Sequence, residues 1–138
     1  MKDLLYLKDE QLKEFIEKLF ISYRESFGDA KKTLEKHSLG IAHHKVIHII
    51  SIHHGITISN LLKKLKVTKQ SLNRILNDLV KFNIVSFVKD ERDSRMKHVY
   101  LTKNGEEVFK EIFTSQKKRI YNALIKSESL EVNNLKSV

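Results

Sequence analysis

The feature that most constrains this fold is a pair of short helical periodicities separated by three residues in the middle of the chain. In the first, leucines recur at helical spacing within Ile58–Leu65, and Thr57 stands where an N-terminal cap is expected. The second runs from Lys69 to about Phe82, and its apolar stripe consists of Leu72, Ile75, Leu76 and Leu79. Two short helices joined by a connection as brief as Lys66–Thr68 predict a helix-turn-helix.

Two short stretches of β-type residues follow these helices. Residues 84–88 are rich in β-branched and aromatic side chains, and residues 97–101 alternate, with Val99 and Leu101 on one face. The segment between them, residues 89–96, is too charged to be core, which predicts the exposed tip of a β-hairpin. We therefore expect a mostly α-helical chain with a small β-hairpin wing, in which a winged helix-turn-helix is joined to further helices.

The chain on the N-terminal side of this lobe is helical by pattern. Its apolar side chains recur at helical spacing and form a broad stripe made of Leu12, Phe15, Ile16, Leu19, Phe20 and Tyr23. Asp9 is the expected N-terminal cap, and Gly28 with Asp29 is expected to weaken this helix before residues 30–37. A second helix fits residues 41–53. The absence of proline and the presence of only 4 glycines favour long helices.

A last long helix is expected after the hairpin. Thr102 is its expected N-terminal cap, and its apolar stripe includes Val108, Phe109, Ile112 and Phe113. The tail over residues 127–138 is weakly patterned and looks short for the end of such a helix. We therefore divide one compact subunit into a helical segment over residues 1–40, a winged lobe over 41–102 and a helical segment over 103–138.

Positive charge is concentrated in the predicted lobe. The chain has a net charge of +9, and residues 57–103 hold 11 Lys and Arg against 4 Asp and Glu, a net charge of +7. Such a field favours a polyanionic partner, nucleic acid first and a membrane surface second. The residues expected to contact the DNA backbone are Lys63, Lys64, Thr68 and Lys69. Contacts of this kind supply affinity but no sequence readout.

Several classes of protein are disfavoured by what the sequence lacks. No apolar run is long enough to span a bilayer or to serve as a signal peptide, so we expect a cytoplasmic protein with no membrane partner. The absence of cysteine excludes disulfides and thiol-based sensing. The sequence contains no phosphate-binding loop, dinucleotide-binding turn or nucleophile elbow, so we expect neither an enzyme nor a cofactor.

The outward side of the helix over residues 69–82 fits the reading of base edges. The residues that lie off its apolar stripe, and that we expect to read bases, are Gln70, Ser71, Asn73, Arg74 and Asn77. Glutamine and asparagine pair with adenine edges and arginine with guanine, which favours a sequence-specific binder of double-stranded DNA. The alternatives are a sequence-blind architectural DNA-binding protein, a winged helix that binds protein, and an ordinary solvated helix.

The charged hairpin tip is the second candidate DNA contact. Arg92 is expected to enter a narrow minor groove, where the negative potential is greatest. Asp90 is expected to orient that guanidinium, and Arg95 to stiffen the tip by pairing with Asp90 or Asp93. The alternative is a solvated charged turn that binds nothing.

The tip and the strand after it resemble a known family. Asp90-Glu91-Arg92-Asp93-Ser94-Arg95, followed by Val99-Tyr100-Leu101-Thr102 and Gly105, resembles the wing signature of the MarR family. The order of helices is similar to that family over almost the whole chain. Within the family, the residues at 20–24, 42–48 and 68–72 are most similar to the PetP-type subset. Asn83 stands where the family often has glycine, and asparagine tolerates the left-handed conformation.

This resemblance implies a homodimeric transcription regulator that binds a pseudo-palindromic operator. It further implies that the N- and C-terminal helices of both chains interlock, so that residues 1–40 and 103–138 are dimerisation segments and supply the partner for the apolar stripes. Two recognition helices would then reach half-sites about one DNA turn apart.

The seven histidines raise the question of an effector, because five of them cluster between His43 and His54. His44 and His48 are four residues apart on one helix face, which suits a pair of metal ligands, and His37 or His43 would add a third. The resemblance implies that small-molecule pockets lie where the dimer helices meet the lobe, so His43, His44 and His48 form a candidate effector pocket. Structural roles for these histidines are the alternative favoured over metal binding.

Overall fold

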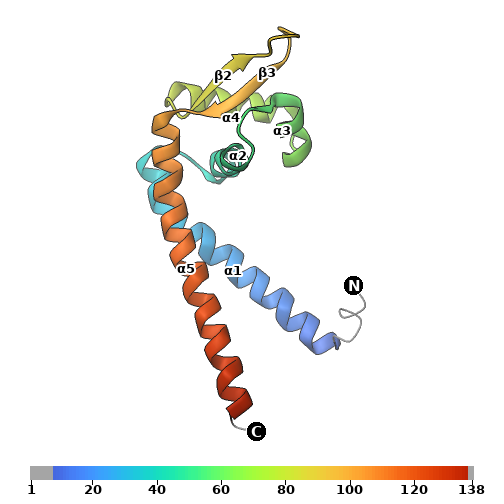
Figure 1. Ribbon diagram of the computed structural model, residues 1–138, viewed down its shortest axis with the longest axis vertical. Coiled ribbons are helices and arrows are strands. Elements are labelled where there is room, and N and C mark those ends of the chain that lie inside the picture. The colour runs from blue at the N-terminus through green and yellow to red at the C-terminus, as the bar shows by residue number, and fades with distance from the viewer. Residues whose placement is uncertain (1–7, 137–138) are drawn as a thin grey trace.

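The computed structural model describes the backbone of residues 8–136 and the side chains of residues 8–122 and 125 (Figure 1). Its elements, in chain order, are α1 (Asp9–Lys36), α2 (Ile41–Ile52), β1 (Ile56–Thr57), α3 (Ile58–Leu65), α4 (Lys69–Lys81), β2 (Val85–Lys89), β3 (Lys97–Leu101) and α5 (Lys103–Lys136). The expected fold class, mostly α-helical with a small β wing, is confirmed. The boundaries of α3 match the expected ones, and those of α2 and α4 differ by one residue at their C-terminal ends.

The β2–β3 hairpin is antiparallel and pairs Phe87 with Val99, while β1 adds a third strand on the other side of β3. The pattern of residues does not predict β1, since two residues are too few to show an alternation. β1 pairs Ile56 with Val99 and so ties the hairpin to the chain that leaves α2. The pairing of β1 with β3 therefore holds the wing to the lobe.

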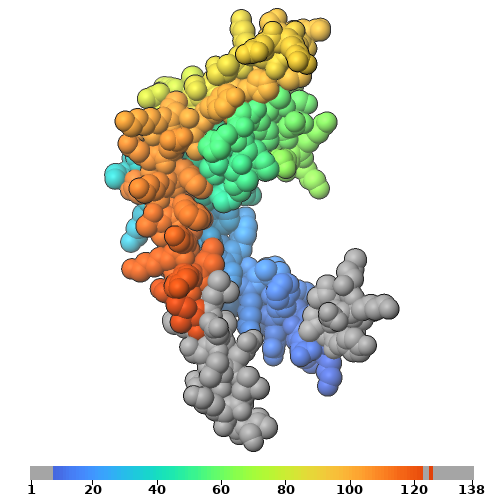
Figure 2. Space-filling model, in the orientation of Figure 1, coloured from blue at the N-terminus to red at the C-terminus, as the bar shows by residue number. Residues whose placement is uncertain are grey.

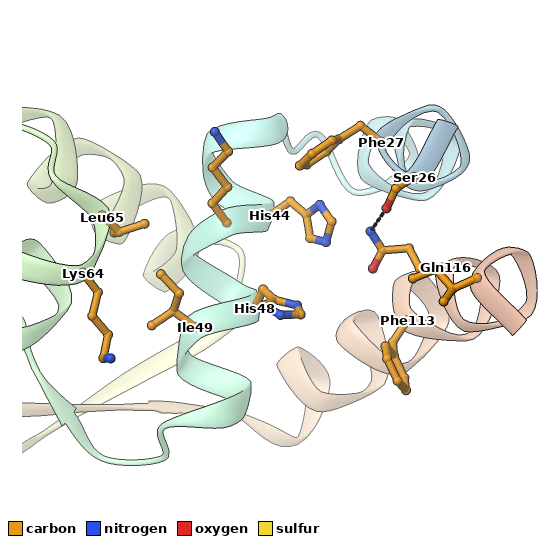
Figure 3. Close-up of a pocket in the computed structure, with 11 residues that line it drawn as sticks. Ser26, Phe27, His44, His48, Ile49, Lys64, Leu65, Phe113 and Gln116 are labelled. Carbon is orange, nitrogen blue, oxygen red and sulfur yellow. Dashed lines mark hydrogen bonds between the residues drawn. The ribbon is translucent and has the colours of Figure 1, made fainter. Parts of the chain in front are cut away.

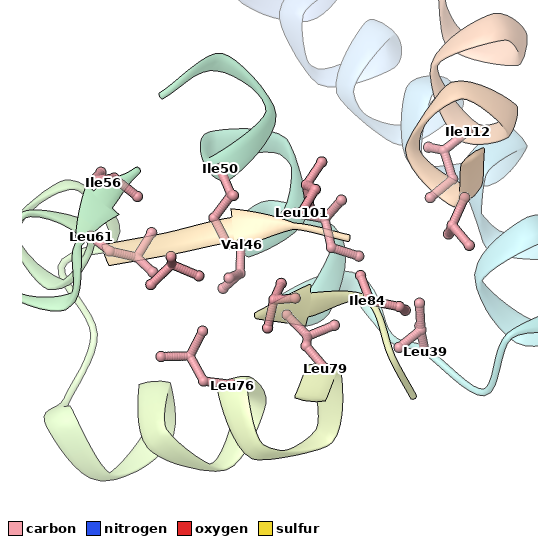
Figure 4. Packing of buried hydrophobic residues seen from close by; sticks show 14 of the residues in the cluster. Leu39, Val46, Ile50, Ile56, Leu61, Leu76, Leu79, Ile84, Leu101 and Ile112 are labelled. Atoms are coloured by element: carbon pink, nitrogen blue, oxygen red, sulfur yellow. The ribbon is translucent and has the colours of Figure 1, made fainter. Parts of the chain in front are cut away.

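The core of the lobe lies between the three helices and this sheet (Figure 4). Each helix turns its apolar stripe inward, so that Val46 and Ile50 of α2, Leu61 of α3, and Leu76 and Leu79 of α4 are almost fully buried. The inward face of β3 adds Val99 and Leu101, as the alternation predicts. Each such side chain contributes about 1.5–3 kcal/mol on burial, so this cluster fixes the outward face of α4.

Threonine hydroxyls cap the three helices that follow α2. Thr57, Thr68 and Thr102 accept hydrogen bonds from the backbone N–H groups three residues later, at 3.2, 3.1 and 2.9 Å. The caps expected at Thr57 and Thr102 are thus confirmed. Lys66 ends α3 in the left-handed conformation, and Asn83 after α4 is also left-handed, as the resemblance implied. Each cap sets the direction of the helix it begins, because it fixes the first turn.

Helix α1 differs from the prediction in two respects. It begins at Asp9 with Lys8 as the N-cap residue, so the cap expected at Asp9 is displaced by one position. It also continues through Gly28 without a break, because packing against α5 outweighs the weak helix propensity there. Arg119 of α5 forms ion pairs with Asp29 and with Glu25, the latter at 3.1 Å.

Helices α1 and α5 pack together near the lobe and then diverge as two long arms, with the N-terminal half of α1 projecting away from the body (Figures 1 and 2). The helix α5 extends to Lys136, so the weakly patterned residues 127–136 are helical. Large apolar side chains remain exposed on the arms, among them Phe15, Phe20 and Tyr121. Within the described residues, no helix is long and apolar enough to cross a membrane.

We predict that Gly105→Ala is strongly destabilising. Gly105 is buried in the first turn of α5, where an added Cβ would press on the carbonyl of Ile84 and lie only 3.2 Å from its Cγ2. Because the obstacle is backbone, relief requires a shift of the helix, and we expect a loss of about 2–3 kcal/mol in the free energy of unfolding. Urea denaturation monitored by circular dichroism measures it.

Gly28→Ala is the matched control. Gly28 lies in the middle of α1, and a Cβ there meets nothing within 4 Å. This substitution should therefore stabilise the protein by about 0.5–1 kcal/mol, because alanine has the higher helix propensity. Equal stabilities of the two variants would contradict the close approach of α5 to Ile84.

Candidate nucleic-acid interface

Helix α4 presents a polar face away from the core. The five residues expected to read bases, Gln70, Ser71, Asn73, Arg74 and Asn77, are all exposed, whereas Leu72, Leu76 and Leu79 between them are buried. Four of the five are uncharged and carry amide or hydroxyl groups, which donate and accept hydrogen bonds. The structure therefore brings these side chains together on one free face of the second helix of the helix-turn-helix.

The basic side chains expected to contact phosphates lie on either side of the connection between α3 and α4, in the last turn of α3 and at the first residue of α4. Lys63, Lys64 and Lys69 are exposed, and each carries an ammonium group that suits a phosphate. Thr68 has a different role, since its Oγ1 accepts from the backbone N–H of Ser71 and donates to the Ser71 hydroxyl at 2.9 Å. Its proton is used inside the chain, and its hydroxyl serves α4 as a cap.

The hairpin tip is ordered by two carboxylates. One oxygen of Asp90 accepts from the backbone N–H groups of Arg92 and Asp93, at 3.1 and 3.0 Å. Asp93 in turn accepts from the backbone and the guanidinium of Arg95, so the pairing of Arg95 with Asp93 occurs and the alternative with Asp90 does not. The tip is thus a turn whose backbone is held by hydrogen bonds to Asp90 and Asp93.

Arg92 is exposed, and within the described part of the chain no acceptor pairs with its guanidinium. The expectation that Asp90 orients this guanidinium is therefore corrected, because the hydrogen bonds of Asp90 go to the tip backbone and to His98 and none goes to the guanidinium. One oxygen of Asp90 binds the backbone of the tip, and the other binds Nε2 of His98 at 2.8 Å. Asp90 shapes the turn that carries Arg92, and the guanidinium is left free to reach outward.

The Asp90–His98 pair changes the titration of both groups. The hydrogen bond from His98, followed by those from the tip backbone, lowers the pKa of Asp90 below its ordinary value of 3.8. The hydrogen bond to Asp90, followed by that to the Gly55 carbonyl, raises the pKa of His98 above 6.5. Sequence reasoning did not single out His98, and its place eight residues after Asp90 on the outer face of β3 is the signal that was available.

A second histidine–carboxylate pair joins α2 to α4. His43 of α2 has Nδ1 3.0 Å from the backbone N of Gly40, which donates to it, so that nitrogen carries no proton. The ring proton is therefore on Nε2, which donates to Asp78 of α4 at 2.9 Å. Asp78 follows Asn77 directly, so this bond connects the start of α2 to the helix that presents the polar face.

An apolar cavity of about 460 Å³ lies between the lobe and the two outer helices (Figure 3). Its lining includes Phe27, His44, His48, Phe113 and Gln116. His44 is buried, and no described residue hydrogen-bonds either of its ring nitrogens. Burial, aided by His48, lowers the pKa of His44, so its ring is neutral and offers one donor and one acceptor.

The structure separates the three histidines of the candidate effector pocket. His44 and His48 line the cavity, with ring centroids 6.4 Å apart. His43 is not part of the lining and forms a hydrogen bond with Asp78. His37, the other suggested third ligand, contacts Glu111 at 3.4 Å. Among the described residues, no group of three or more His, Asp or Glu side chains could hold a metal ion.

Comparisons with known proteins agree with this geometry. A family model described as the MarR family matches residues 37–96. The HTH-type transcriptional regulator PetP of Rhodobacter capsulatus is 40% identical over 117 residues, which are 85% of this chain and 70% of that protein. The resemblance to the PetP-type subset is thereby confirmed.

Solved structures show the same fold. A transcriptional regulator from Thermotoga maritima has a TM-score of 0.72 at 18% identity and covers 91% of both chains. The DNA complex of MepR from S. aureus has a TM-score of 0.66 at 23% identity, over 83% of this chain and 86% of that one. Staphylococcus aureus MarR in complex with salicylate and kanamycin has a TM-score of 0.69 at 19% identity, over 92% and 90%.

Proposed function

Because the chain belongs to the MarR family, we propose that it is a transcriptional regulator that binds double-stranded DNA as a homodimer at a pseudo-palindromic operator. The family is one of regulators and not of enzymes, which confirms the expectation that the protein is no enzyme. The observation that carries the proposal is the exposed amide-rich face of α4, set within a segment whose net charge is +7.

Each part of the interface has its own task in this proposal. Helix α4 enters the major groove, where Arg74 pairs with a guanine edge and the amides of α4 pair with adenine edges. Lys63, Lys64 and Lys69 neutralise phosphates and set the register. Arg92 at the wing tip enters the adjacent minor groove.

A sequence-blind architectural protein is the alternative. Such a protein binds through phosphates and DNA shape, and it has no need of amides on the helix that faces the groove. Gln70, Asn73 and Asn77 together favour base reading, since lysine and glutamate are the usual residues of an exposed helix face.

The exposed apolar side chains of the arms support the homodimer. Leu12, Phe15, Leu19 and Phe20 of α1 and Ile120 of α5 are 41–71% exposed in the single chain. A contiguous apolar surface of this kind marks an interface, and a second copy of the same arms supplies a matching surface. We therefore assign residues 1–40 and 103–138 to dimerisation and residues 41–102 to DNA binding.

We also propose that the cavity of Figure 3 binds a small effector. Its lining is mainly apolar, and the neutral ring of His44 offers an unused donor and acceptor to a polar group. Because the lining comes from α1, α2, α3 and α5, a ligand there contacts both the proposed dimerisation segments and the lobe. Its binding would thereby bias the separation of the two α4 helices.

Selection from a randomised duplex pool tests the proposed function. We expect enrichment of an inverted repeat whose half-sites are about one helical turn apart. Tight, steeply salt-dependent binding without enrichment would support the architectural alternative. The absence of any binding at low salt would contradict DNA binding by the free protein.

On the selected duplex, Arg74→Ala should lose about 1–3 kcal/mol of base discrimination, because a guanine contact disappears. Lys64→Ala is the matched comparison and should weaken all duplexes about equally, lowering the salt slope by about one. Arg92→Ala should lower affinity most at A·T-rich flanks. Titration by fluorescence anisotropy at several salt concentrations measures all three, and unchanged discrimination in Arg74→Ala would refute the placement of α4.

For the homodimer, we predict that Phe20→Glu weakens self-association at least about tenfold, which corresponds to about 1.4 kcal/mol. Phe20 is 71% exposed in the single chain, and a carboxylate there would be buried without a partner in the dimer. Sedimentation velocity measures the dissociation constant, with Lys18→Glu, also on α1, as the control. An equal effect of both variants would argue against this face.

For the effector, we predict that salicylate, used as a probe, raises the unfolding temperature of the wild type more than that of His44→Phe. Phenylalanine preserves the apolar ring and removes both ring nitrogens, so the difference isolates the hydrogen bond. Differential scanning fluorimetry over a concentration series measures the shift, which follows the affinity for the folded state. Equal shifts in both proteins would remove His44 from the site.

A further inference from the structure

His98 occupies a position between the wing tip and the rest of the lobe. It lies on β3, and its side chain is 26% exposed. Its Nδ1 is 2.8 Å from the carbonyl oxygen of Gly55, in the turn between α2 and β1. Its Nε2 is 2.8 Å from Oδ1 of Asp90, where the hairpin tip begins. One imidazole thus spans from the tip to the body of the lobe.

Both partners of this ring are acceptors. A backbone carbonyl has no proton to give, and the carboxyl group of Asp90 is ionised because its pKa is lowered. Both ring nitrogens must therefore donate, and only the doubly protonated imidazolium does so. A neutral ring carries a single N–H, so on deprotonation one nitrogen lone pair faces an oxygen and one of the two hydrogen bonds of His98 is lost.

Each end of this bridge holds a part of the structure in place. At the outer end, the second oxygen of Asp90 binds the backbone N–H groups of Arg92 and Asp93. At the inner end, Gly55 is left-handed, with φ of 78°, and its Cα lies so close to Tyr100 that a Cβ would be 2.7 Å from the hydroxyl oxygen. The bridge therefore joins the turn that carries Arg92 to a tightly packed turn of the lobe.

We propose that His98 is a positioning residue whose doubly protonated form fixes the wing tip to the lobe and makes wing-dependent DNA binding require a bound proton. The inference rests on the proposed function, because the wing is taken to contact DNA. The protein would thereby bind its operator more tightly at acidic than at alkaline pH.

The surroundings of His98 set the direction of this effect. In the sheet, Val88 of β2 and Thr57 of β1 pair with it, and the neighbouring titratable groups are Lys89 of β2, Lys97 and Tyr100 of β3, and His53 and His54 in the turn that holds Gly55. Asp90 and the Gly55 carbonyl raise the pKa of His98, and partial burial opposes them.

The sign of the pH dependence follows. A raised pKa in the folded state means that the bridge stabilises the wing below pH 6.5 and that this stabilisation is lost as pH rises through the raised pKa. At the acid end, the contribution of Asp90 is present above its ordinary pKa of 3.8 and is lost as pH falls through its lowered pKa. The tip is therefore most firmly held in mildly acidic solution.

A titration of the ring nitrogens tests the bridge without DNA. In the ¹⁵N-labelled protein, His98 should show both ring nitrogens protonated at pH 6 and titrate above 6.5, and Asp90→Asn should move its pKa down. A neutral ring at pH 6, or titration at or below 6.5 in the wild type, would overturn the inference. This measurement uses the wild-type fold, so it does not depend on a variant that folds.

The second test is DNA affinity between pH 6 and pH 8.5 at fixed ionic strength. We expect the wild type to lose about three- to tenfold in affinity over this range, and His98→Gln to lose most of that dependence, because glutamine does not titrate. His37→Gln is the matched control, since His37 also contacts a carboxylate, that of Glu111, but lies at the end of α1. It should keep the wild-type dependence.

The outcomes separate this inference from the proposed function. An unchanged pH dependence in His98→Gln, with operator binding intact, would overturn the role of His98 and leave the regulator standing. Loss of the dependence in His37→Gln as well would assign it to histidines in general and would also overturn the role of His98. Failure of the wild type to bind any duplex at pH 6 would refute the proposed function itself, while the nitrogen titration would still decide the state of the bridge.

Discussion

The packing of α2 is the constraint on which the rest of this structure depends. Val46, Ile47 and Ile50 are at most 1% exposed, and α2 contacts α1, α3, α4, α5 and β3. A helix that is apolar on nearly all sides has to be surrounded, so the other elements are arranged around it.

The same helix carries His44 and His48 on the cavity side and His43 on the side of α4. The His43–Asp78 hydrogen bond thus connects the helix that lines the cavity to α4, and we propose it as the route by which the proposed effector acts on DNA binding.

Two histidine–carboxylate pairs support the two parts of the proposed interface, and the backbone partners of their rings differ. His43 accepts from the Gly40 backbone at Nδ1 and donates to Asp78 of α4 from Nε2. His98 donates at both nitrogens and so holds the wing tip only as an imidazolium. The difference arises because the backbone offers a donor to one ring and an acceptor to the other. The pair at α4 is thus made by a ring with one donor and one acceptor as partners, whereas the pair at the wing tip requires a ring that donates twice.

The long arms are the structural basis of the proposed homodimer. Near the lobe, the ion pairs of Arg119 with Glu25 and Asp29 and the hydrogen bond between Gln116 and Ser26 join α1 to α5. Farther out the helices diverge (Figure 1), and large apolar side chains of the described part of α1, among them Phe15 and Phe20, are exposed. The divergence leaves room for the arms of a second copy, and that copy would also fix the distance between the two α4 helices. Dimerisation and operator spacing are, in this proposal, one geometric property.

The sequence by itself determined the helices and strands of the lobe other than β1, and the outward face of α4. The spacing of Leu72, Leu76 and Leu79 fixes which side of that helix is buried, and Thr57 and Thr102 mark where helices begin, because both signals act within a few residues.

Tertiary structure decided the features that depend on residues far apart in the chain. The continuity of α1 past Gly28 depends on α5, Thr68 caps α4, and Asp90 binds the tip backbone and the His98 ring rather than the Arg92 guanidinium. His43 and His98 acquire their roles from Asp78 and Gly55, which lie 35 and 43 residues away in the chain. Local periodicity carries no information about such pairs, since they form only once the packing around α2 has brought their elements together.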